Sequence, residues 1–379
     1  MPDRVRIEQC LSRGQWKLFE RVPEILHGDD PAFVPPIPGE VAKLGRRRGP
    51  FEEIGTIRGY VAFRGREPVG RVASIENRTH NEYHDDRVGF FGFFSFRDAD
   101  VAGELMKQVR SDLADLGLNP IRGPFSPTQN DECGLQIEGF GGRPYFGMPY
   151  NPPWYEEVYD GLGLEPVRDH LAYRLDPGMQ AAFDGRMATL VERVRARVPA
   201  TVRPVDMGRL EEEAALVSRV FNESLAEEWN FMPLSPERAM EFTKDLVGHL
   251  GADCVLIAEV DGQPAGLSIG FPDLNEFMDD AKRFPRWLRW PRLAWLLKTR
   301  KCRRGRWAVF GMLDEFRERG GTLLLVYDAI ARGLEQFQEG ELSWTQDINT
   351  DVNRLAEQLG LKPYRRYRVY ETPAEGRLG

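Results

Sequence analysis

The sequence predicts an α/β (α+β) chain of two similar domains in tandem, each a mixed, mostly antiparallel sheet flanked by helices. Three observations support this prediction. The 379 residues are enough for two hydrophobic cores. A hairpin signature occurs once in each half, and the same order of strand and helix patterns follows both hairpins.

Four pairs of glycine and proline positions carry the repeat. The segments FRGREPVGR (63–71) and VDGQPAGLS (260–268) each indicate two apolar strands joined by a tight glycine turn. The segments LGLEP (162–166) and LGLKP (359–363) each precede an alternating strand. Offsets of 196 or 197 residues relate all four pairs. Such a constant offset indicates a duplicated domain.

Each half also contains one long amphipathic helix pattern. The first begins near 98–100 and ends at Gly117, and the second begins after Gly321 and ends at Gly340. These helices are about 222 residues apart, so the second copy has about 25 additional residues before its helix. The extra residues form a basic and aromatic insertion at 282–306.

These patterns set the predicted domain boundaries. We predict an N-terminal domain at 1–177, a helical connector at 178–197 and a C-terminal domain at 198–379. The segment DPGM (176–179) is the predicted joint, since proline and glycine favour a linker.

Charge and cysteine content exclude several classes of function. The net charge is −8, and without the nine cations of 284–306 it is about −17, so we expect no nucleic-acid partner. The four cysteines form no CxxC pair and the five histidines no HExxH motif, so we expect no metal. No segment has the length of a signal peptide or a membrane span. We therefore predict a cytoplasmic protein, with a peripheral position on the inner membrane as the alternative.

A candidate phosphate-binding loop follows the predicted strand 306–313. It contains Arg317, Arg319, Gly320, Gly321 and Thr322, and a helix begins directly after it. Helix N-termini present unpaired N–H groups to phosphates, glycines allow close approach, and arginines add charged hydrogen bonds. The alternative is an ordinary strand–loop–helix turn.

This loop resembles the R/Q-x-x-G-x-G/A acyl-CoA loop of the GNAT acyltransferases, with Thr322 in place of the usual small third residue. The resemblance implies two tandem GNAT-like domains, of which the C-terminal one binds acyl-CoA. It also implies that a backbone N–H at the end of the strand, near Leu313, polarises the thioester carbonyl.

The GNAT pattern continues after the next strand. Asn349 lies at the same distance from Gly360 as the Asn of that pattern lies from its Gly. In GNAT enzymes a Tyr between these two residues usually protonates the leaving thiolate, but here Ala356 has that position. In the N-terminal half, Tyr159 has the Tyr position, but the junction FFGFFSFRDADVAGE has no glycine–arginine loop. The N-terminal domain is thus predicted to be an altered copy.

The whole chain resembles a family of tandem GNAT-like proteins that includes the bacterial ceramide synthases. The stretches that carry this resemblance are FFGFFSF, IRGPFSPTQND, MPYNPPWYEEVYDGLGL, FNESLAEEWNFMPLSPE and ELSWTQDINTDVNRLAEQLG. It implies acyl-CoA-dependent N-acylation of a sphingoid base, sphinganine or 3-ketosphinganine. Two alternatives remain open: short-chain acetylation of a soluble amine, and a non-catalytic lipid- or CoA-binding protein.

Other polar residues are candidates for substrate contact and catalysis. Thr128 and Asn130 would bind the substrate's polar head or form a surface turn, and Asn151 is a further substrate-binding candidate. Asp347 would accept the proton of the attacking amine or cap a helix. Glu341 is a weaker candidate for the base because it begins the strand.

The insertion FPRWLRWPRLAWLLKTRKCRRGR (284–306) combines nine Lys or Arg with three Trp. Pro291 is predicted to open a short helix. This composition is typical of a helix at the surface of an anionic membrane. The alternative is a helix packed on its own domain with a solvated cationic edge.

Overall fold

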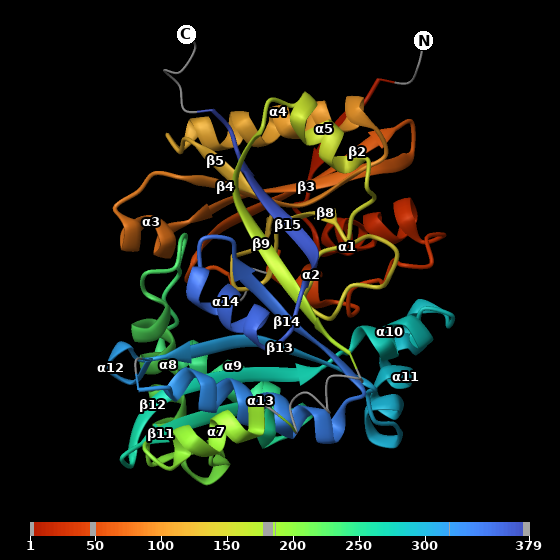
Figure 1. The fold of residues 1–379 in the computed structure, drawn as a ribbon. Helices are drawn as coiled ribbons and strands as arrows, with labels where there is room; N and C mark the ends of the chain where they lie inside the picture. The colour runs from red at the N-terminus through yellow and green to blue at the C-terminus, as the bar shows by residue number, and fades with distance from the viewer. Residues whose placement is uncertain (1–3, 46–50, 177–184, 186, 318, 374–379) are drawn as a thin grey trace. The chain divides into compact units, whose positions relative to one another are not determined.

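A computed structural model describes residues 4–45, 51–176, 185, 187–317 and 319–373. The chain forms two compact units (Figure 1). Unit 1 consists of Met1–His170, Leu274–Arg300 and Arg365–Gly379, and unit 2 of Leu171–Asp273 and Lys301–Tyr364.

The units differ from the predicted domains in three segments. The segment Leu274–Arg300, which includes most of the insertion at 282–306, belongs to unit 1, and so does the end of the chain from Arg365. The residues from Leu171 belong to unit 2, although the N-terminal domain was predicted to extend to residue 177. Most of the predicted joint, 177–179, lies outside the described residues, so that boundary stays a prediction. The helix α7 (Ala188–Arg195) lies within the predicted connector.

Unit 1 contains a sheet with helices on both faces. Its strands follow the order β1-β2-β3-β4-β5-β15, β8 also pairs with β15, and only β4 and β5 are parallel. Its elements are β1 (Arg6–Gln9), α1 (Arg13–His27), α2 (Glu40–Leu44), β2 (Gly55–Arg64), β3 (Glu67–Asn77), α3 (Arg78–His84), β4 (Gly89–Phe96), α4 (Ala99–Asp115), β5 (Ile121–Gly123), β6 (Phe125–Ser126), β7 (Glu132–Cys133), β8 (Leu135–Glu138), α5 (Tyr155–Gly161), α10 (Asn275–Ala281), α11 (Arg286–Thr299) and most of β15 (Pro363–Glu371).

Local sequence explains how α1 and α4 form and pack on β3. Ser12 and Gln15 form a capping box at the start of α1, and Asp98 caps α4. A side chain at Gly70 would collide with Val101 of α4, while the next residue of β3 reaches Phe19 of α1. Successive strand residues point to opposite faces, so α1 and α4 cover opposite faces of this sheet.

Unit 2 repeats this arrangement. Its strands follow the order β14-β13-β12-β11-β10, and only β13 and β14 are parallel. Its further elements are β10 (Ala200–Pro204), α8 (Leu210–Leu225), α9 (Pro236–Leu250), β11 (Val255–Val260), β12 (Gln263–Pro272), β13 (Arg304–Met312), α12 (Asp314–Arg317), α13 (Gly321–Gln336), β14 (Glu339–Gln346) and α14 (Thr350–Gln358). The strand β9 (Glu165–Leu175) begins in unit 1 and ends in unit 2.

The strand registers confirm the duplication. Ala62 pairs with Gly70 in unit 1, Ala258 pairs with Gly266 in unit 2, and the register shifts directly after each of these alanines. The shared bulge aligns the two hairpins residue by residue at an offset of 196. The mixed, mostly antiparallel sheets and their flanking helices confirm the predicted fold class.

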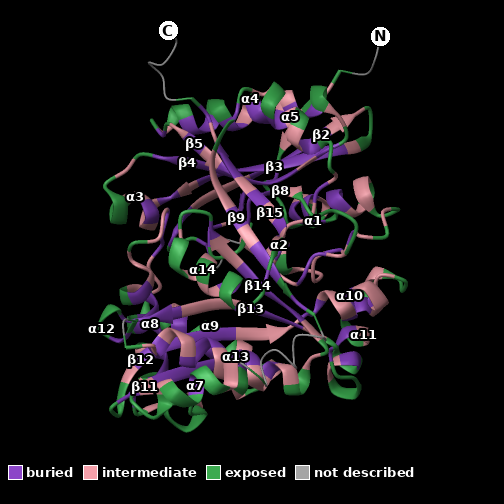
Figure 2. Ribbon diagram, in the orientation of Figure 1, coloured by how far each residue is buried: buried purple, intermediate pink, exposed green. Residues whose placement is uncertain are grey.

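Two element boundaries differ from the sequence-based expectation. The helix α13 ends at Gln336, because Gly340 already pairs with Gly305 as part of β14. The helix α11 begins at Arg286, so Pro291 lies inside it rather than at its start. The inner strands of both sheets are buried (Figure 2). Within the described ranges, the helices are all too short or too polar to cross a membrane.

Candidate active site

The parallel strands β13 and β14 of unit 2 pair over only part of their length. Four residue pairs join them, from Arg304 and Glu339 to Trp307 and Leu342. No further pair joins residues 308–312 and 343–346, all of which are described, while β13 stays paired with β12 as far as Met312. The carboxyl ends of β13 and β14 therefore separate beyond Trp307 and Leu342, and ligands of open α/β sheets bind at the carboxyl ends of strands.

The N-terminus of α13 lies directly beyond these strand ends. Gly320 adopts a left-handed conformation with φ 85°. A Cβ on Gly321 would lie 2.9 Å from the Phe316 carbonyl oxygen, so a side chain does not fit there. The first turn of this 16-residue helix has no acidic side chain. Its unpaired N–H groups and dipole suit a phosphate group, and Thr322 lies in the same turn.

The two loop arginines hold the loop in place. Arg317 donates to the Met312 carbonyl at 2.8 Å and to the Ser224 carbonyl at 2.7 Å. Arg319 donates to Asp261 at 2.9 Å. Both side chains remain almost half exposed. These contacts anchor the loop to α8 and to the β11–β12 turn, and direct contact between either arginine and a phosphate stays a prediction.

The backbone N–H of Leu313 is already used within the sheet. It donates to the Ala265 carbonyl at 2.9 Å, and the side chain is buried. A role for this N–H at a thioester carbonyl would require that bond to open. The separated edge of β13 offers other backbone groups for that purpose.

A carboxylate meets an amide near the end of β14. Asn349 caps α14 through its side-chain oxygen and donates its Nδ2 to Glu228 Oε1 at 2.6 Å. Glu228 lies in the loop between α8 and α9. Gln346 holds the same loop by donating to the Trp229 carbonyl at 2.9 Å. The predicted Asn349 is thus joined to a carboxylate that sequence reasoning missed.

The surroundings of Glu228 suit a general base. Burial raises the pKa of Glu228 above 4.5, against the lowering effects of the Asn349 hydrogen bond and the Arg317 charge. A carboxylate with a raised pKa accepts a proton more readily near neutral pH. The stretch FNESLAEEWNF (221–231) holds three acidic residues, and nothing in its local pattern singled out Glu228.

The two acidic residues predicted for catalysis are placed differently. Asp347 is exposed and accepts a hydrogen bond from the Ile348 N–H at 3.0 Å, as in a local turn. Glu341 is fully buried, accepts from Ser343 Oγ at 2.5 Å and also accepts from the Tyr364 hydroxyl. Arg306 donates to Ser343 at 2.9 Å. The carboxylate of Glu341 is therefore held in an internal network.

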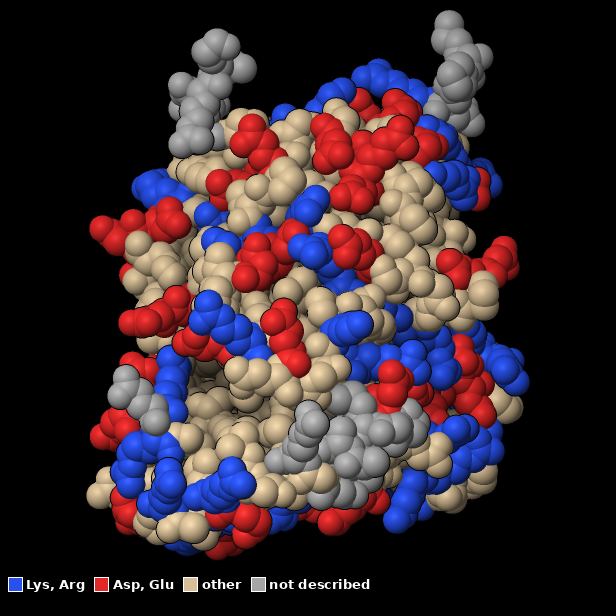
Figure 3. Space-filling model, in the orientation of Figure 1, with Lys and Arg blue, Asp and Glu red and all other residues tan. Residues whose placement is uncertain are grey.

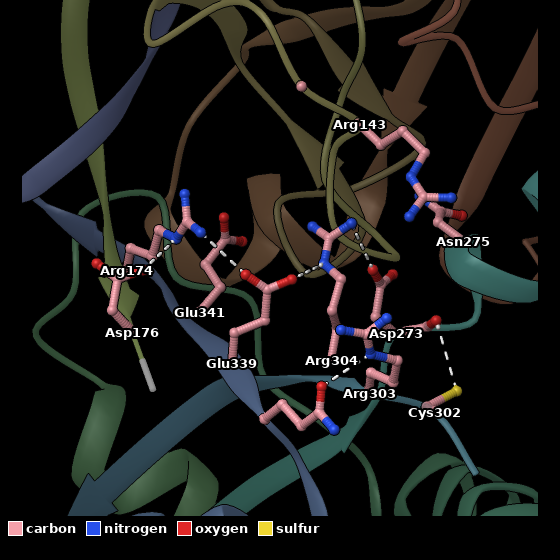
Figure 4. A network of polar contacts seen from close by, with 12 residues as sticks. Arg143, Arg174, Asp176, Asp273, Asn275, Cys302, Arg303, Arg304, Glu339 and Glu341 are labelled. Carbon is pink, nitrogen blue, oxygen red and sulfur yellow. Dashed lines mark hydrogen bonds and ion pairs between the residues drawn. The ribbon is translucent and has the colours of Figure 1, made fainter. Parts of the chain in front are cut away.

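Ion pairs also join the paired ends of the same strands. In Figure 4, Glu339 of β14 contacts Arg304 of β13 at 3.7 Å and Arg174 of β9 at 3.0 Å. Arg304 also contacts the fully buried Asp273 at 3.3 Å. These contacts hold β13 and β14 together at the ends opposite to those that separate.

The other predicted catalytic residue, Tyr159, belongs to unit 1. It is 1% exposed, and its ring lies 5.6 Å from Phe94 and 5.1 Å from Tyr370. Burial raises its pKa well above the usual value, so the hydroxyl is a weaker acid than a free tyrosine. The structure places Tyr159 in the aromatic core of unit 1, and its catalytic role stays a prediction.

The predicted substrate-binding residues of unit 1 are used in local structure. Thr128 donates from its hydroxyl to Asp131 at 2.7 Å and accepts from the Asn130 N–H at 3.2 Å, which is a turn motif. Asn151 exchanges hydrogen bonds of 2.8 and 3.0 Å with the backbone of Gln136. The turn interpretation fits Thr128 and Asn130, and substrate contact by these three residues stays a prediction.

The segment Leu274–Arg300 contributes helices α10 and α11 to unit 1, and of these α11 lies within the insertion. Arg286 pairs with Glu20 and Glu24, and Arg289 also pairs with Glu24. Arg292 pairs with Asp280 at 2.8 Å. Figure 3 shows acidic atoms among the basic ones where Figure 1 labels these helices. Much of the predicted positive charge is therefore neutralised within unit 1.

Tryptophans occupy the outer face of α11. Trp287 is 76% exposed, and Trp290 and Trp295 are about half exposed. Leu293 and Leu296 are buried on the opposite side. Within the described parts of the chain, no group of three or more His, Cys, Asp or Glu residues is arranged to hold a metal ion.

Comparison with known proteins finds relatives that match nearly the whole chain. No protein-family model matches the chain. Protein YghO of Escherichia coli (strain K12) is 30% identical over 96% of this chain and 94% of its own length. The bacterial ceramide synthase of Caulobacter vibrioides (strain NA1000 / CB15N) is 26% identical over 94% of each chain.

Solved structures show the same fold. A tandem GNAT protein from the clavulanic acid biosynthesis pathway matches 98% of this chain and 100% of its own, with TM-score 0.57 and 13% identity. A GCN5-related N-acetyltransferase from Sphaerobacter thermophilus matches 99% and 98%, with TM-score 0.54 and 14% identity. The chain belongs to the tandem GNAT-like acyltransferase family that includes the bacterial ceramide synthases, and it is an acyl-CoA-dependent N-acyltransferase.

Proposed function

We propose that this protein transfers a fatty acyl group from acyl-CoA to the amine of a sphingoid base, and that the reaction takes place in unit 2. The observation that carries this assignment is the separation of β13 and β14 beside a glycine-lined helix N-terminus that has no acid. The relationship to a bacterial ceramide synthase supports the long-chain amine as acceptor.

The residues of unit 2 have separate roles in this proposal. The N–H groups of Gly321 and Thr322 bind the pyrophosphate of CoA. The thioester lies between the separated strands, where N–H groups of β13 stabilise the developing oxyanion. Glu228 takes a proton from the substrate ammonium, directly or through water, and Asn349 holds Glu228 in place.

The chemical step is a direct displacement. The neutral amine attacks the thioester carbonyl, the C–N bond forms, and the C–S bond breaks to release CoA. One proton of the ammonium leaves to Glu228, and a second proton leaves the attacking nitrogen to solvent as the amide forms. In the C-terminal half, Ala356 stands at the usual tyrosine position and is buried, so solvent is the proposed source for protonation of the thiolate.

We further propose that α11 places the protein at a membrane surface where long-chain amines reside. Its exposed tryptophans suit the headgroup level of a bilayer. Because Arg286, Arg289 and Arg292 are already paired with acids, insertion of aromatic rings contributes more to this contact than charge does. Binding should therefore depend only weakly on salt.

Purified protein tested with two acyl donors and two acceptors distinguishes the alternatives. We expect thiol release and an amide product of the correct mass with palmitoyl-CoA and sphinganine or 3-ketosphinganine. Preference for acetyl-CoA and a soluble amine would contradict the lipid substrate. Binding of CoA without turnover on any amine would contradict the enzymatic assignment to unit 2.

A further inference from the structure

The side chain of Arg71 is a buried cation in the middle of unit 1. It lies on β3, and the residue is only 8% exposed. Its Nη1 donates to the Phe19 carbonyl at 3.0 Å. A guanidinium has five N–H groups, and this is the one hydrogen bond that Arg71 makes to the residues that the structure describes. Its Nε is buried without an acceptor.

The aromatic neighbours of Arg71 compensate only part of its charge. The guanidinium carbon lies 4.9 Å from the centre of the Phe19 ring and 5.5 Å from that of Phe93. Cation–π contacts of this kind contribute about 1–2 kcal/mol, whereas removing an ion from water costs several kcal/mol. Arg71 forms no ion pair with any residue in the described part of the chain.

The acidic side chain most deeply buried near Arg71 already has partners of its own. Both oxygens of Glu20 accept from the Gly39 N–H at 2.9 Å, and one also accepts from Ala42 at 3.0 Å. Arg286 supplies an ion pair to the same carboxylate. Glu20 is therefore neutralised by α2 and α11, and it does not act as a dedicated counter-ion for Arg71.

Among the titratable groups near Arg71, the charges of Glu132 and Glu20 act on it without forming an ion pair, and Cys10, His27 and Tyr155 are neutral at physiological pH. Burial raises the pKa of Cys10 to about 12 and lowers the pKa of His27 to about 4. Burial also raises the pKa of Tyr155, whose hydroxyl lies 3.1 Å from His27 Nε2. Burial lowers the pKa of Arg71 itself to about 10, which leaves it charged. Within the described part of the chain, this buried positive charge is therefore attracted by carboxylates but forms no ion pair with any of them.

The duplicated hairpin shows that the fold does not require this cation. Arg71 follows Gly70 as Leu267 follows Gly266, with the same bulge beside each pair. Leu267 is 0% exposed and lies in the apolar core of unit 2. A leucine therefore satisfies the packing at this position, and the arginine of unit 1 needs another explanation.

We propose that Arg71 binds the carboxylate or phosphate group of a ligand inside unit 1, between α1 and the β3–β4 strands. An oxyanion would accept from the free edge of the guanidinium in a bidentate manner. Phe19 and Phe93 would pack against the apolar part of the same ligand. This site goes beyond the proposed acyl transfer, which takes place in unit 2 and does not depend on it.

Thermal unfolding of the full chain tests the proposal, with hexanoate, hexyl phosphate and inorganic phosphate as probes and hexanol as the neutral control. An anion at a hundredfold excess over its Kd should raise the Tm by about 5 °C. Comparison of hexanoate with hexyl phosphate identifies the headgroup. Equal effects of hexanol and hexanoate would overturn the proposal.

Two variants test whether the anion-dependent rise in Tm depends on Arg71. Arg71→Leu, which installs the residue of unit 2, should abolish the anion-dependent shift and melt no lower than wild type in anion-free buffer. Arg110→Leu, which removes an exposed cation from α4, should retain the shift. A shift that persists in Arg71→Leu would overturn the assignment.

If Arg71→Leu does not fold, hydrogen exchange of the wild-type protein with and without the anions tests the proposal instead. The proposal requires the anions to slow exchange in β4 around Phe93. Unchanged exchange there would overturn it.

Discussion

The two units share a hairpin, a bulge and a long helix, but they begin that helix in opposite ways. In unit 1, β4 leads almost directly into α4, and Asp98 accepts from the Val101 N–H at 3.1 Å. In unit 2, eight residues separate β13 from α13, and Gly320 stands where the acid would be. One helix N-terminus is closed by the protein's own carboxylate and the other is open to an external anion.

With acyl transfer assigned to unit 2 as proposed, the duplicated fold keeps its core while the two copies have different functions. Helix dipoles are equivalent in both units, so the residues at the cap decide whether a phosphate can bind. A second contrast, between Arg71 and Leu267, lies at matching positions of the hairpin. Substitutions at these positions test the two contrasts and are given from the largest expected change in activity, affinity or stability to the smallest.

Replacement of the proposed base should have the largest effect. Glu228→Gln keeps the shape of the side chain and the contact with Asn349, but it cannot accept a proton. We expect kcat to fall by about 10²–10³-fold with little change in KM for acyl-CoA. The measurement is steady-state thiol release, with Glu227→Gln of the same loop as control. Full activity of Glu228→Gln would remove this residue from the mechanism.

The same variant gives a pH test. Because the pKa of Glu228 is raised, its carboxylate becomes protonated earlier than an ordinary glutamate as the pH falls. Wild-type activity should therefore decrease on the acid side through a pKa above 4.5, and the residual activity of Glu228→Gln should lack this limb.

An acidic residue in the first turn of α13 should give this helix N-terminus a carboxylate, as Asp98 does for α4 in unit 1. Thr322→Asp puts a carboxylate in the first turn, where it favours the helix but repels a phosphate. We expect the Kd for CoA to rise about 30-fold, or about 2 kcal/mol, with no loss of Tm. Thr322→Asn is the neutral control. Unchanged CoA affinity, measured by calorimetry, would mean that the phosphates bind elsewhere.

The exposed face of α11 should account for membrane binding. Trp287→Ala should reduce binding to anionic liposomes by about tenfold, since a large aromatic side chain is lost from the interface. Sedimentation with liposomes at low and high salt measures this. Leu11→Ala, at another exposed apolar position of unit 1, is the control. Binding that disappears at high salt but survives Trp287→Ala would indicate charge as the cause.

Removal of the cap in unit 1 should have the smallest effect and leave CoA binding unchanged. Asp98→Ala should lower the free energy of unfolding by about 1 kcal/mol at neutral pH. Although burial opposes it, the hydrogen bonds from Arg64 and the Val101 N–H hold the pKa of Asp98 below 3.8. The stabilisation is thus present above this pH and lost as the pH falls through the lowered pKa. The free energies of unfolding of wild type and Asp98→Ala, measured at two pH values, check the direction of this pH dependence.

The sequence predicted those parts of the fold and of the candidate site that depend on residues close to one another along the chain. Glycine spacing predicted both hairpins, and helical periodicity predicted α4 and α13. The loop at Arg317–Thr322 was found because strand, glycines and helix are consecutive. Capping by Asp98 and by Asn349 likewise needs contacts of only three residues.

Other features depended on residues far apart in sequence. Glu228 is 121 residues from Asn349, and Glu20 is 266 residues from Arg286. No local pattern indicates such pairs. The basic insertion therefore seemed an isolated patch of charge, whereas folding brings acids of α1 to it.

The duplication and the fold class follow from the sequence alone, and the sequence also predicts the phosphate loop, because each depends on spacing within a short segment. Only the tertiary structure decided which carboxylate meets Asn349, which unit holds the insertion, and that Arg71 is buried without a counter-ion. Those outcomes depend on which distant side chains share a desolvated interior, where pairing or its absence sets the energy of a charge.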